Sequence, residues 1–211
     1  MRFSQLIAKV AFIVDDVGGV TYTADIVREF LADAELSIVN LKPGANPATG
    51  QIDATAGTKQ AIPSDGVRLL AVDLIGGRSA RLVERGALDD LNPFWRNETP
   101  ANSAGEYIVD DRQPKAFETP PLQAGVAIAL TYDQFPEEYD FVQNPDPELS
   151  LDRHYGPAMV DYAVYRCLSR ADENTAELAK AMAHQRAFLS AIGAQAQIDS
   201  SQTPRARRHE R

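Results

Sequence analysis

Apolar residues recur at helical spacing near both ends of this chain, whereas its middle holds short apolar runs separated by Gly, Pro and Asp. This pattern predicts helices over residues 4–14, 23–41 and 155–192, with strands and turns over residues 51–135. Strands do not alternate with helices in the middle, so a Rossmann-type fold is not expected. The order predicts an α+β protein in which N- and C-terminal helices form a helical bundle, with an inserted antiparallel β-rich domain that projects from it.

The helix expected over residues 23–41 is amphipathic. Thr23 is a candidate N-cap with Asp25 in the first turn, and Lys42-Pro43-Gly44 should end the helix. The charged residues, Glu35 among them, are expected mostly on the faces away from the core. The apolar stripe consists of Ile26, Val27, Phe30, Leu31, Ala34, Ile38 and Leu41.

Two apolar stripes near the C-terminal end predict a helical hairpin. Asp172 is a candidate N-cap between the two helices, and Gly193 is the expected end of the second. The first stripe consists of Met159, Val160, Ala163, Val164, Cys167 and Leu168, and the second of Leu178, Met182, Gln185, Leu189 and Ile192.

Glycine turns punctuate the middle of the chain. Ala56-Gly57 lies between the candidate strands 51–55 and 58–62, and Gly76-Gly77 lies between the candidate strands 67–75 and 80–84. Both patterns predict β-hairpins, because glycine accepts the positive φ that tight hairpin turns need. Three further short strands, over residues 106–109, 116–119 and 126–132, extend the prediction to an antiparallel sheet or a small sandwich.

These elements suggest a division of the 211 residues into four parts. Residues 1–45 and 153–193 are expected to form the helical bundle, and residues 46–135 the β-rich insertion. Residues 136–152, which include three prolines, are expected to form an extended connector. Residues 194–211, rich in Gln, Ser and Arg, are expected to form a basic flexible tail.

Composition limits the classes of function that need to be considered. The net charge of −9 argues against a general nucleic-acid binder, since Lys and Arg supply most non-specific affinity for phosphates. The single cysteine, Cys167, excludes an intrachain disulfide and suggests a reducing compartment such as a cytoplasm. No window approaches about 18 consecutive apolar residues, so no membrane span is predicted. The N-terminal apolar run, residues 10–14, is too short and too closely flanked by charge for a signal peptide.

Charge is concentrated in two places. Residues 133–152 contain no Lys or Arg and seven acids, among them Glu137, Glu138, Asp140, Asp146 and Glu148, which are candidate interface residues. A solvated loop is the simpler interpretation of such a run. The C-terminal tail gathers four arginines, Arg205, Arg207, Arg208 and Arg211, which would serve either as a binding element or as a solubilising tail.

Candidate chemistry is sparse. The three histidines, His154, His184 and His209, lack the short ligand spacing of structural zinc sites. A hydrolase built from scattered carboxylates such as Asp73, Asp110 and Asp111 is the alternative enzymatic interpretation. No nucleophile motif or phosphate-binding loop is present, so the prediction is a non-enzymatic protein without cofactor or metal.

A series of motifs extends over residues 2–193: Gly-Gly-Val-Thr-Tyr-Thr at 18–23, Leu-Lys-Pro-Gly-Ala-Asn-Pro at 41–47, the Gly-Thr-Lys-Gln turn at 57–60 with Pro63, Arg-Leu-Leu at 68–70, Gly-Arg at 77–78, residues 107–110 with Phe117 and Pro-Pro at 120–121, and Asp-Tyr-Ala-Val-Tyr-Arg at 161–166. This order resembles the head-to-tail adaptors of tailed phages, called tail tubular proteins in short-tailed phages. Most of the matched positions are turn formers or core residues.

The resemblance implies a virion structural protein of the neck or tail, assembled in the bacterial host cytoplasm and without catalysis. It further implies a homo-oligomeric ring, expected to have 12 subunits, that binds the portal protein and a tail nozzle or tail tube protein. The genomic DNA would pass through this ring without specific binding, and acids of the connector could line the lumen. In related adaptors the C-terminal extension docks on the portal, a role that would fall to the four tail arginines. Another neck or tail-completion protein is the alternative within the same class.

Overall fold

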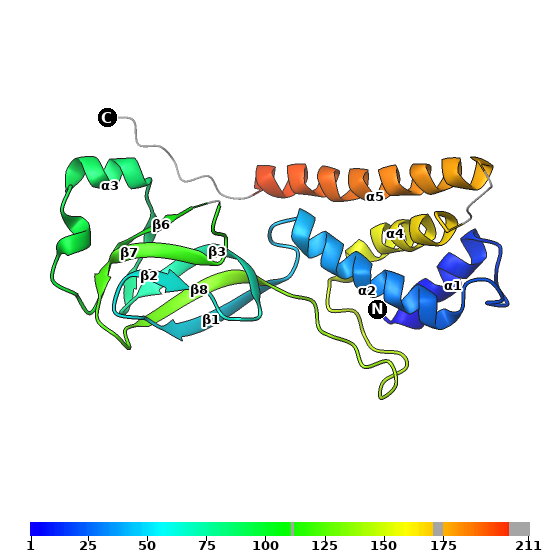
Figure 1. The fold of residues 1–211 in the computed structure, drawn as a ribbon, viewed down its shortest axis with the longest axis horizontal. Coiled ribbons are helices and arrows are strands. Elements are labelled where there is room, and N and C mark those ends of the chain that lie inside the picture. The colour runs from blue at the N-terminus through cyan, green and yellow to red at the C-terminus, as the bar shows by residue number, and fades with distance from the viewer. Residues whose placement is uncertain (111, 171–174, 203–211) are drawn as a thin grey trace. The chain divides into compact units, whose positions relative to one another are not determined.

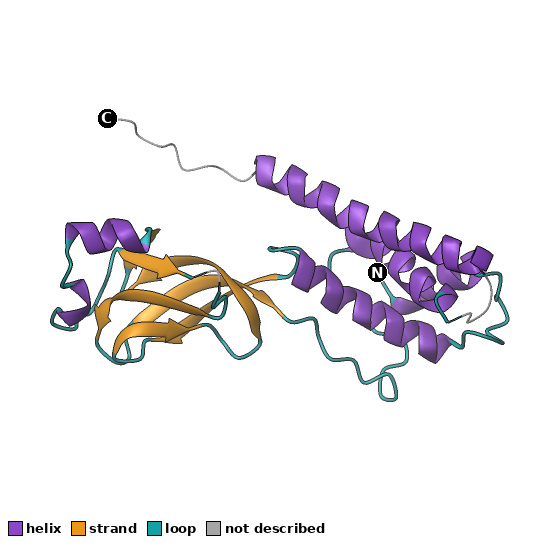
Figure 2. Cartoon of the chain, turned by 45° about the horizontal axis from the view of Figure 1, so that its top comes forward, coloured by secondary structure: helices purple, strands orange, loops and turns teal. Residues whose placement is uncertain are grey.

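The computed structural model describes residues 1–110, 112–170 and 175–202 of the chain, with side-chain surroundings up to residue 193 (Figure 1). Within this part the protein is α+β, with five α-helices and two four-stranded sheets (Figure 2). The chain divides into two compact units. One, the helical unit, combines Met1–Lys42 with the chain from Pro136 onward, and the other, the β-rich unit, consists of Pro43–Phe135.

The helical unit is organised around one central helix. Helix α4 (Gly156–Leu168) packs against α1 (Phe3–Ile13), α2 (Ala24–Leu41) and α5 (Thr175–Gln202). A short 3-10 turn, η2 (Arg153–Tyr155), leads directly into α4. The expected apolar stripe of α4 is confirmed, because all six of its residues are buried. Helices from the two ends of the sequence therefore share one core, since each has an apolar face too large to leave in water.

Helix α2 has the predicted ends. The Thr23 hydroxyl accepts a hydrogen bond from the Ile26 amide at 3.5 Å, which confirms the N-cap, and Lys42 is the C-cap. The prediction for Glu35 is wrong, because its side chain is fully buried. Glu35 lies at the flank of the apolar stripe, and this flank is covered by the connector (residues 136–152), which hydrogen bonds to it through Tyr139 and Leu151.

Helix α5 differs from the prediction in two respects. It continues through Gly193 to Gln202, so Gly193 does not end it. Glycine costs only about 1 kcal/mol in a helix interior, and the following Ala-Gln-Ala-Gln run favours continuation. The buried face consists of Ala181, Phe188 and Ile192, while Leu178, Met182 and Leu189 of the expected stripe remain exposed. The Asp172 cap candidate lies outside the described residues.

The β-rich unit contains two sheets with strand orders β1-β8-β3-β4 and β2-β7-β6-β5. All pairings are antiparallel except β5 with β6. The two sheets share one apolar core, to which Ile75, Ile128 and Leu130 contribute from the first sheet and Phe117 and Leu122 from the second. The strands are β1 (Pro47–Asp53), β2 (Gly57–Ala61), β3 (Gly66–Ile75), β4 (Arg78–Ser79), β5 (Arg81–Leu82), β6 (Glu106–Val109), β7 (Ala116–Leu122) and β8 (Ala127–Gln134).

The turn of one predicted hairpin is confirmed, although its second strand is residues 78–79 and not 80–84, and the other predicted hairpin is wrong. Gly76 and Gly77 both have positive φ and join β3 to β4, although β4 is only two residues long. Strands β1 and β2, by contrast, belong to different sheets. The expected backbone hydrogen bonds between the two strands are absent from the described structure, and the Gln60 side chain bonds to the Thr55 backbone instead. The buried side-chain amide of Gln60 accepts from the Thr55 N–H and donates to the Thr55 carbonyl, both at 2.9 Å. The Gly57 turn is therefore stabilised by a side chain, and each flanking strand pairs elsewhere.

Candidate assembly surfaces

The first candidate surface is a shallow groove between α1 and α4, with a volume of about 510 Å³. Its lining is mainly apolar and includes Phe12, which is 79% exposed. The uninterrupted apolar run at residues 10–14 could have indicated this, because one helix face cannot bury five consecutive residues. The groove is lined by Ala8, Lys9, Phe12, Ile13, Pro157, Val160 and Asp161.

The loop after α1 carries two further exposed apolar residues. Val17 and Val20 are 77% and 88% exposed. The Asp16 carboxylate accepts hydrogen bonds from the backbone amides of Val20, Thr21 and Tyr22 at 2.7–2.9 Å. The bond from Tyr22 is the main cause of a lowered pKa of Asp16, and those from Val20 and Thr21 add to it. The loop thus presents its valines from a backbone that one ionised side chain fixes.

The second candidate surface lies on α5. Leu178, Met182 and Leu189 are each about half exposed and fall on one side of the helix at spacings of four and seven residues. We call these three residues the α5 stripe. Exposed large apolar side chains that gather on one face are typical of interaction sites, whereas isolated ones are ordinary.

The connector is attached to the helical unit at both α1 and α2. The ring of Phe3, which is fully buried, lies 4.8 Å from the Tyr139 ring and 5.3 Å from the Phe141 ring. The Leu149 amide donates to the Met1 carbonyl at 2.9 Å. The expected extended segment is thus held against the helices by aromatic packing and backbone hydrogen bonds.

The five candidate acids of the connector have different surroundings. Asp146 accepts from the Ser4 amide at 2.8 Å, and this bond at the N-terminus of α1 is the first cause of its lowered pKa. Asp140 accepts from the amides of Val142 and Gln143, as in a local turn. Glu148 lies 3.9 Å from Arg2. Glu137 and Glu138 are exposed.

Glu35 is the centre of a buried polar network that joins α2 to the connector. Its carboxylate accepts from the Tyr139 hydroxyl at 2.6 Å and from the Leu151 amide at 3.0 Å. The Tyr139 oxygen also accepts from the Ser150 amide at 2.8 Å. Burial raises the pKa of Glu35, while the hydrogen bonds oppose this shift in part. Burial likewise raises the pKa of Tyr139.

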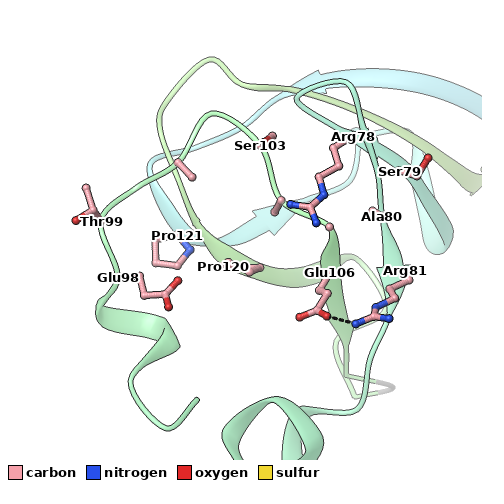
Figure 3. Close-up of a pocket in the computed structure, with 13 residues that line it drawn as sticks. Arg78, Ser79, Ala80, Arg81, Glu98, Thr99, Ser103, Glu106, Pro120 and Pro121 are labelled. Carbon is pink, nitrogen blue, oxygen red and sulfur yellow. Dashed lines mark hydrogen bonds and ion pairs between the residues drawn. The ribbon is translucent and has the colours of Figure 1, made fainter. Parts of the chain in front are cut away.

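The β-rich unit has a cleft of about 680 Å³ beside β4 and β5 (Figure 3). Arg81 forms an ion pair with Glu106, and Glu98, also in the lining, accepts from Asn92 at 2.6 Å. No histidine or cysteine belongs to the lining of this cleft. The acids found there have structural partners, so the cleft offers charge and hydroxyl groups without a nucleophile and base pair.

Helix α3 (Arg85–Leu91) and the 3-10 turn η1 (Trp95–Asn97) carry another exposed apolar pair. Leu91 is 82% exposed and Phe94 is 73% exposed. Trp95 is buried, and its indole donates to Asp89 at 2.8 Å. The Trp95 anchor fixes the segment that presents the two exposed side chains.

Two residues of the alternative hydrolase interpretation, Asp73 and Asp110, have other hydrogen-bond partners in the described structure. Asp73 accepts from the Thr131 hydroxyl at 3.2 Å, and Asp110 accepts from the Arg112 amide in a turn. Asp111 lies outside the described residues. Burial raises the pKa of the Cys167 thiol to about 11, which leaves it almost entirely protonated near neutral pH.

Two of the three histidines pair with aspartates: His184 with Asp161 at 2.8 Å and His154 with Asp152 at 3.2 Å. His209 lies outside the described residues, as do the tail arginines Arg205, Arg207, Arg208 and Arg211. Within the described ranges, no group of three His, Cys, Asp or Glu side chains could hold a metal ion. No helix in the same part of the chain is long and apolar enough to span a membrane.

Comparison with known proteins adds one match. A family model described as SU10 adaptor protein matches residues 1–208. A search of curated proteins found no match.

Proposed function

This chain belongs to the SU10 adaptor protein family, a family of phage head-to-tail adaptors, and we propose that it forms a ring between the portal and the tail of a virion. The observation that carries the proposal is the family match, which covers residues 1–208 of 211. The exposed apolar surfaces of both units suit a protein whose partners cover them. The ring is proposed to have 12 subunits and to act without catalysis, cofactor or metal.

The proposed division of labour follows the two units. Helices from both ends of the chain would act as one bundle that closes the ring, and the β-rich unit would meet the tail nozzle or tail tube protein, with Leu91 and Phe94 as contact residues. The connector acids Glu137, Glu138, Asp140, Asp146 and Glu148 would contribute negative charge to the channel wall. Like charge on the wall would shorten the residence of passing DNA. Assembly would take place in the host cytoplasm.

The mass of the purified protein, alone and mixed with the portal ring of the same genome, tests this function. We expect a ring on its own or a stoichiometric ring on the portal. A protein that remains monomeric and ignores the portal would contradict the adaptor role. A ring that binds tail components and not the portal would instead favour a tail-completion protein.

Deletion of residues 203–211 should leave the fold intact and weaken portal binding. This segment contributes Arg205, Arg207, Arg208 and Arg211, which would pair with acidic grooves of the portal. Titration of the full-length and truncated proteins against the portal at two salt concentrations measures the effect, and replacement of the four arginines by glutamine controls for length. Equal affinity of all three proteins would assign the tail to solubility alone.

A further inference from the structure

The α5 stripe is a ridge that lacks a covering element among the described residues. Leu178 is 51% exposed, Met182 is 45% and Leu189 is 49%, whereas Ala181 and Phe188 are buried. At about 100° per residue the stripe and the buried face are contiguous, so α5 has one wide apolar face of which α4 covers only part. The uncovered part projects three long, flexible side chains.

The groove between α1 and α4 has the opposite shape. It is concave and mainly apolar, and the 79% exposed ring of Phe12 stands at its edge. Ala8, one helical turn before Phe12, is also exposed, and its small side chain leaves the groove open at this position. A row of large side chains on another helix could therefore enter it, as ridges enter grooves in helix packing.

Ridge and groove lie on different sides of the helical unit. Asp161, which lines the groove, accepts a hydrogen bond from His184 Nδ1 of α5 at 2.8 Å, so this side of α5 is next to the groove. The centre of the stripe is about 140° around α5 from His184, given 3.6 residues per turn. One copy of the chain therefore cannot fill its own groove with its own stripe while α5 keeps this packing.

Charge also matches between Arg186 beside the stripe and the end of the groove at the C-terminus of α1, one turn beyond Lys9. Arg186 is exposed and lies four residues after Met182, beside the stripe. Helix α1 has no basic residue in its last turn and is followed by Asp15 and Asp16. The C-terminal end of a helix carries partial negative charge, so this end of the groove attracts a cation.

We propose that neighbouring copies of this chain join head to tail, with the α5 stripe of one copy seated in the α1–α4 groove of the next. A contact between two different surfaces of the same chain generates a closed ring when the rotation between copies is suitable. Arg186 of one copy then faces the C-terminal end of α1 in the next. This inference rests on the ring proposed above and names the surfaces that close it.

A mixing experiment with two full-length variants tests the proposal. The stripe variant carries Met182→Asp and Leu189→Asp, and the groove variant carries Ala8→Asp and Phe12→Asp; all four side chains are exposed, so both proteins should fold. Each variant alone is expected to lose the ring and keep the monomer mass. A 1:1 mixture is expected to give dimers and nothing larger. The intact stripe of the groove variant can enter the intact groove of the stripe variant, and the dimer then has no intact surface left for a third copy. Ala183→Asp, on an exposed side of α5 away from the stripe, should assemble as the unaltered chain does.

A second measurement leaves the interface intact. Leu189→Cys and Ile13→Cys are introduced on separate chains and treated with a short bismaleimide under conditions in which the unaltered chain forms a ring. Cys167, buried and with its pKa raised to about 11, should not react. Each chain alone should give no crosslinked dimer, and the mixture should give one.

The outcomes separate this inference from the proposed function. If the folded variants assemble like the unaltered chain, or if crosslinks form equally in each cysteine variant by itself, the named surfaces are wrong and the ring stands. A mixture that stays monomeric and uncrosslinked also overturns the surfaces. If the unaltered chain forms no ring with or without the portal, the proposed ring itself fails, and this inference fails with it.

Discussion

Gly76→Ala is expected to lower the free energy of unfolding of the β-rich unit by about 4 kcal/mol, from left-handed backbone strain and forced displacement of a neighbouring loop. Gly76 has a φ of +58°, and a Cβ at this position would lie 1.9 Å from the Asn102 carbonyl oxygen. That contact is with backbone, so no side-chain rotation can relieve it. The loop at residues 101–105 would have to shift, and it lines the cleft beside β4 and β5.

Gly77→Ala is the matched control for Gly76→Ala. Gly77 also has a positive φ, +77°, but an added Cβ there would have no neighbour within 4 Å. It should therefore cost only about 1 to 2 kcal/mol, the usual penalty for an L-residue in this conformation. Denaturant unfolding of both variants measures the difference. Equal destabilisation would show that the close approach of Asn102 does not constrain position 76.

Glu35→Ala is expected to destabilise the helical unit by about 3 kcal/mol, because it removes the acceptor for buried donors. The Leu151 amide would lose its partner, and the Tyr139 hydroxyl would retain only its contact with Ser150. Glu35→Gln should cost much less, since an amide oxygen can still accept from the Leu151 amide. Denaturant unfolding followed by helical circular dichroism measures both. Equal losses for Ala and Gln would show that the network contributes through charge and not through hydrogen bonding.

Comparison of the unaltered protein with Glu35→Gln also predicts a pH dependence of stability. Burial raises the pKa of Glu35 in the folded state above its ordinary value of 4.5, so the folded state holds the proton more tightly than the unfolded state. The stabilisation from this proton is complete below pH 4.5 and is lost as the pH rises through the raised folded pKa. Relative to Glu35→Gln, the unaltered protein should therefore lose stability as the pH rises through that range. A difference that stays constant from pH 4 to pH 8 would contradict a raised pKa.

The sequence predicted the helices and strands better than it predicted which of their side chains are exposed as candidate surfaces. The apolar residues of α5 were recognised, but Leu178, Met182 and Leu189 were expected in the core and are exposed. How much of a wide apolar face is buried depends on the helix packed against it. The sequence of α5 alone does not show how much of its face α4 covers. The connector acids were recognised as a charged run, yet the role of Asp146 at the start of α1 depends on a contact between residues 142 positions apart.

The sequence by itself determined the features that depend on neighbours within a few residues. The ends of α2 follow from Thr23 and the Lys42-Pro43-Gly44 stop, the β3–β4 turn follows from two glycines, and β6 was predicted with its observed ends. The order of the motifs also indicated the adaptor family, which the family match confirms.

Only the tertiary structure decided which distant segments meet. Local turn chemistry correctly predicted a turn at Gly57, but the pairing of β1 with β8 and of β2 with β7 depends on which partners complete each sheet and its core. The burial of Glu35 likewise depends on the connector, about 100 residues away along the chain, which covers the flank of α2. Local propensities set the elements, whereas burial and partner choice arise from long-range packing that no short window of sequence contains.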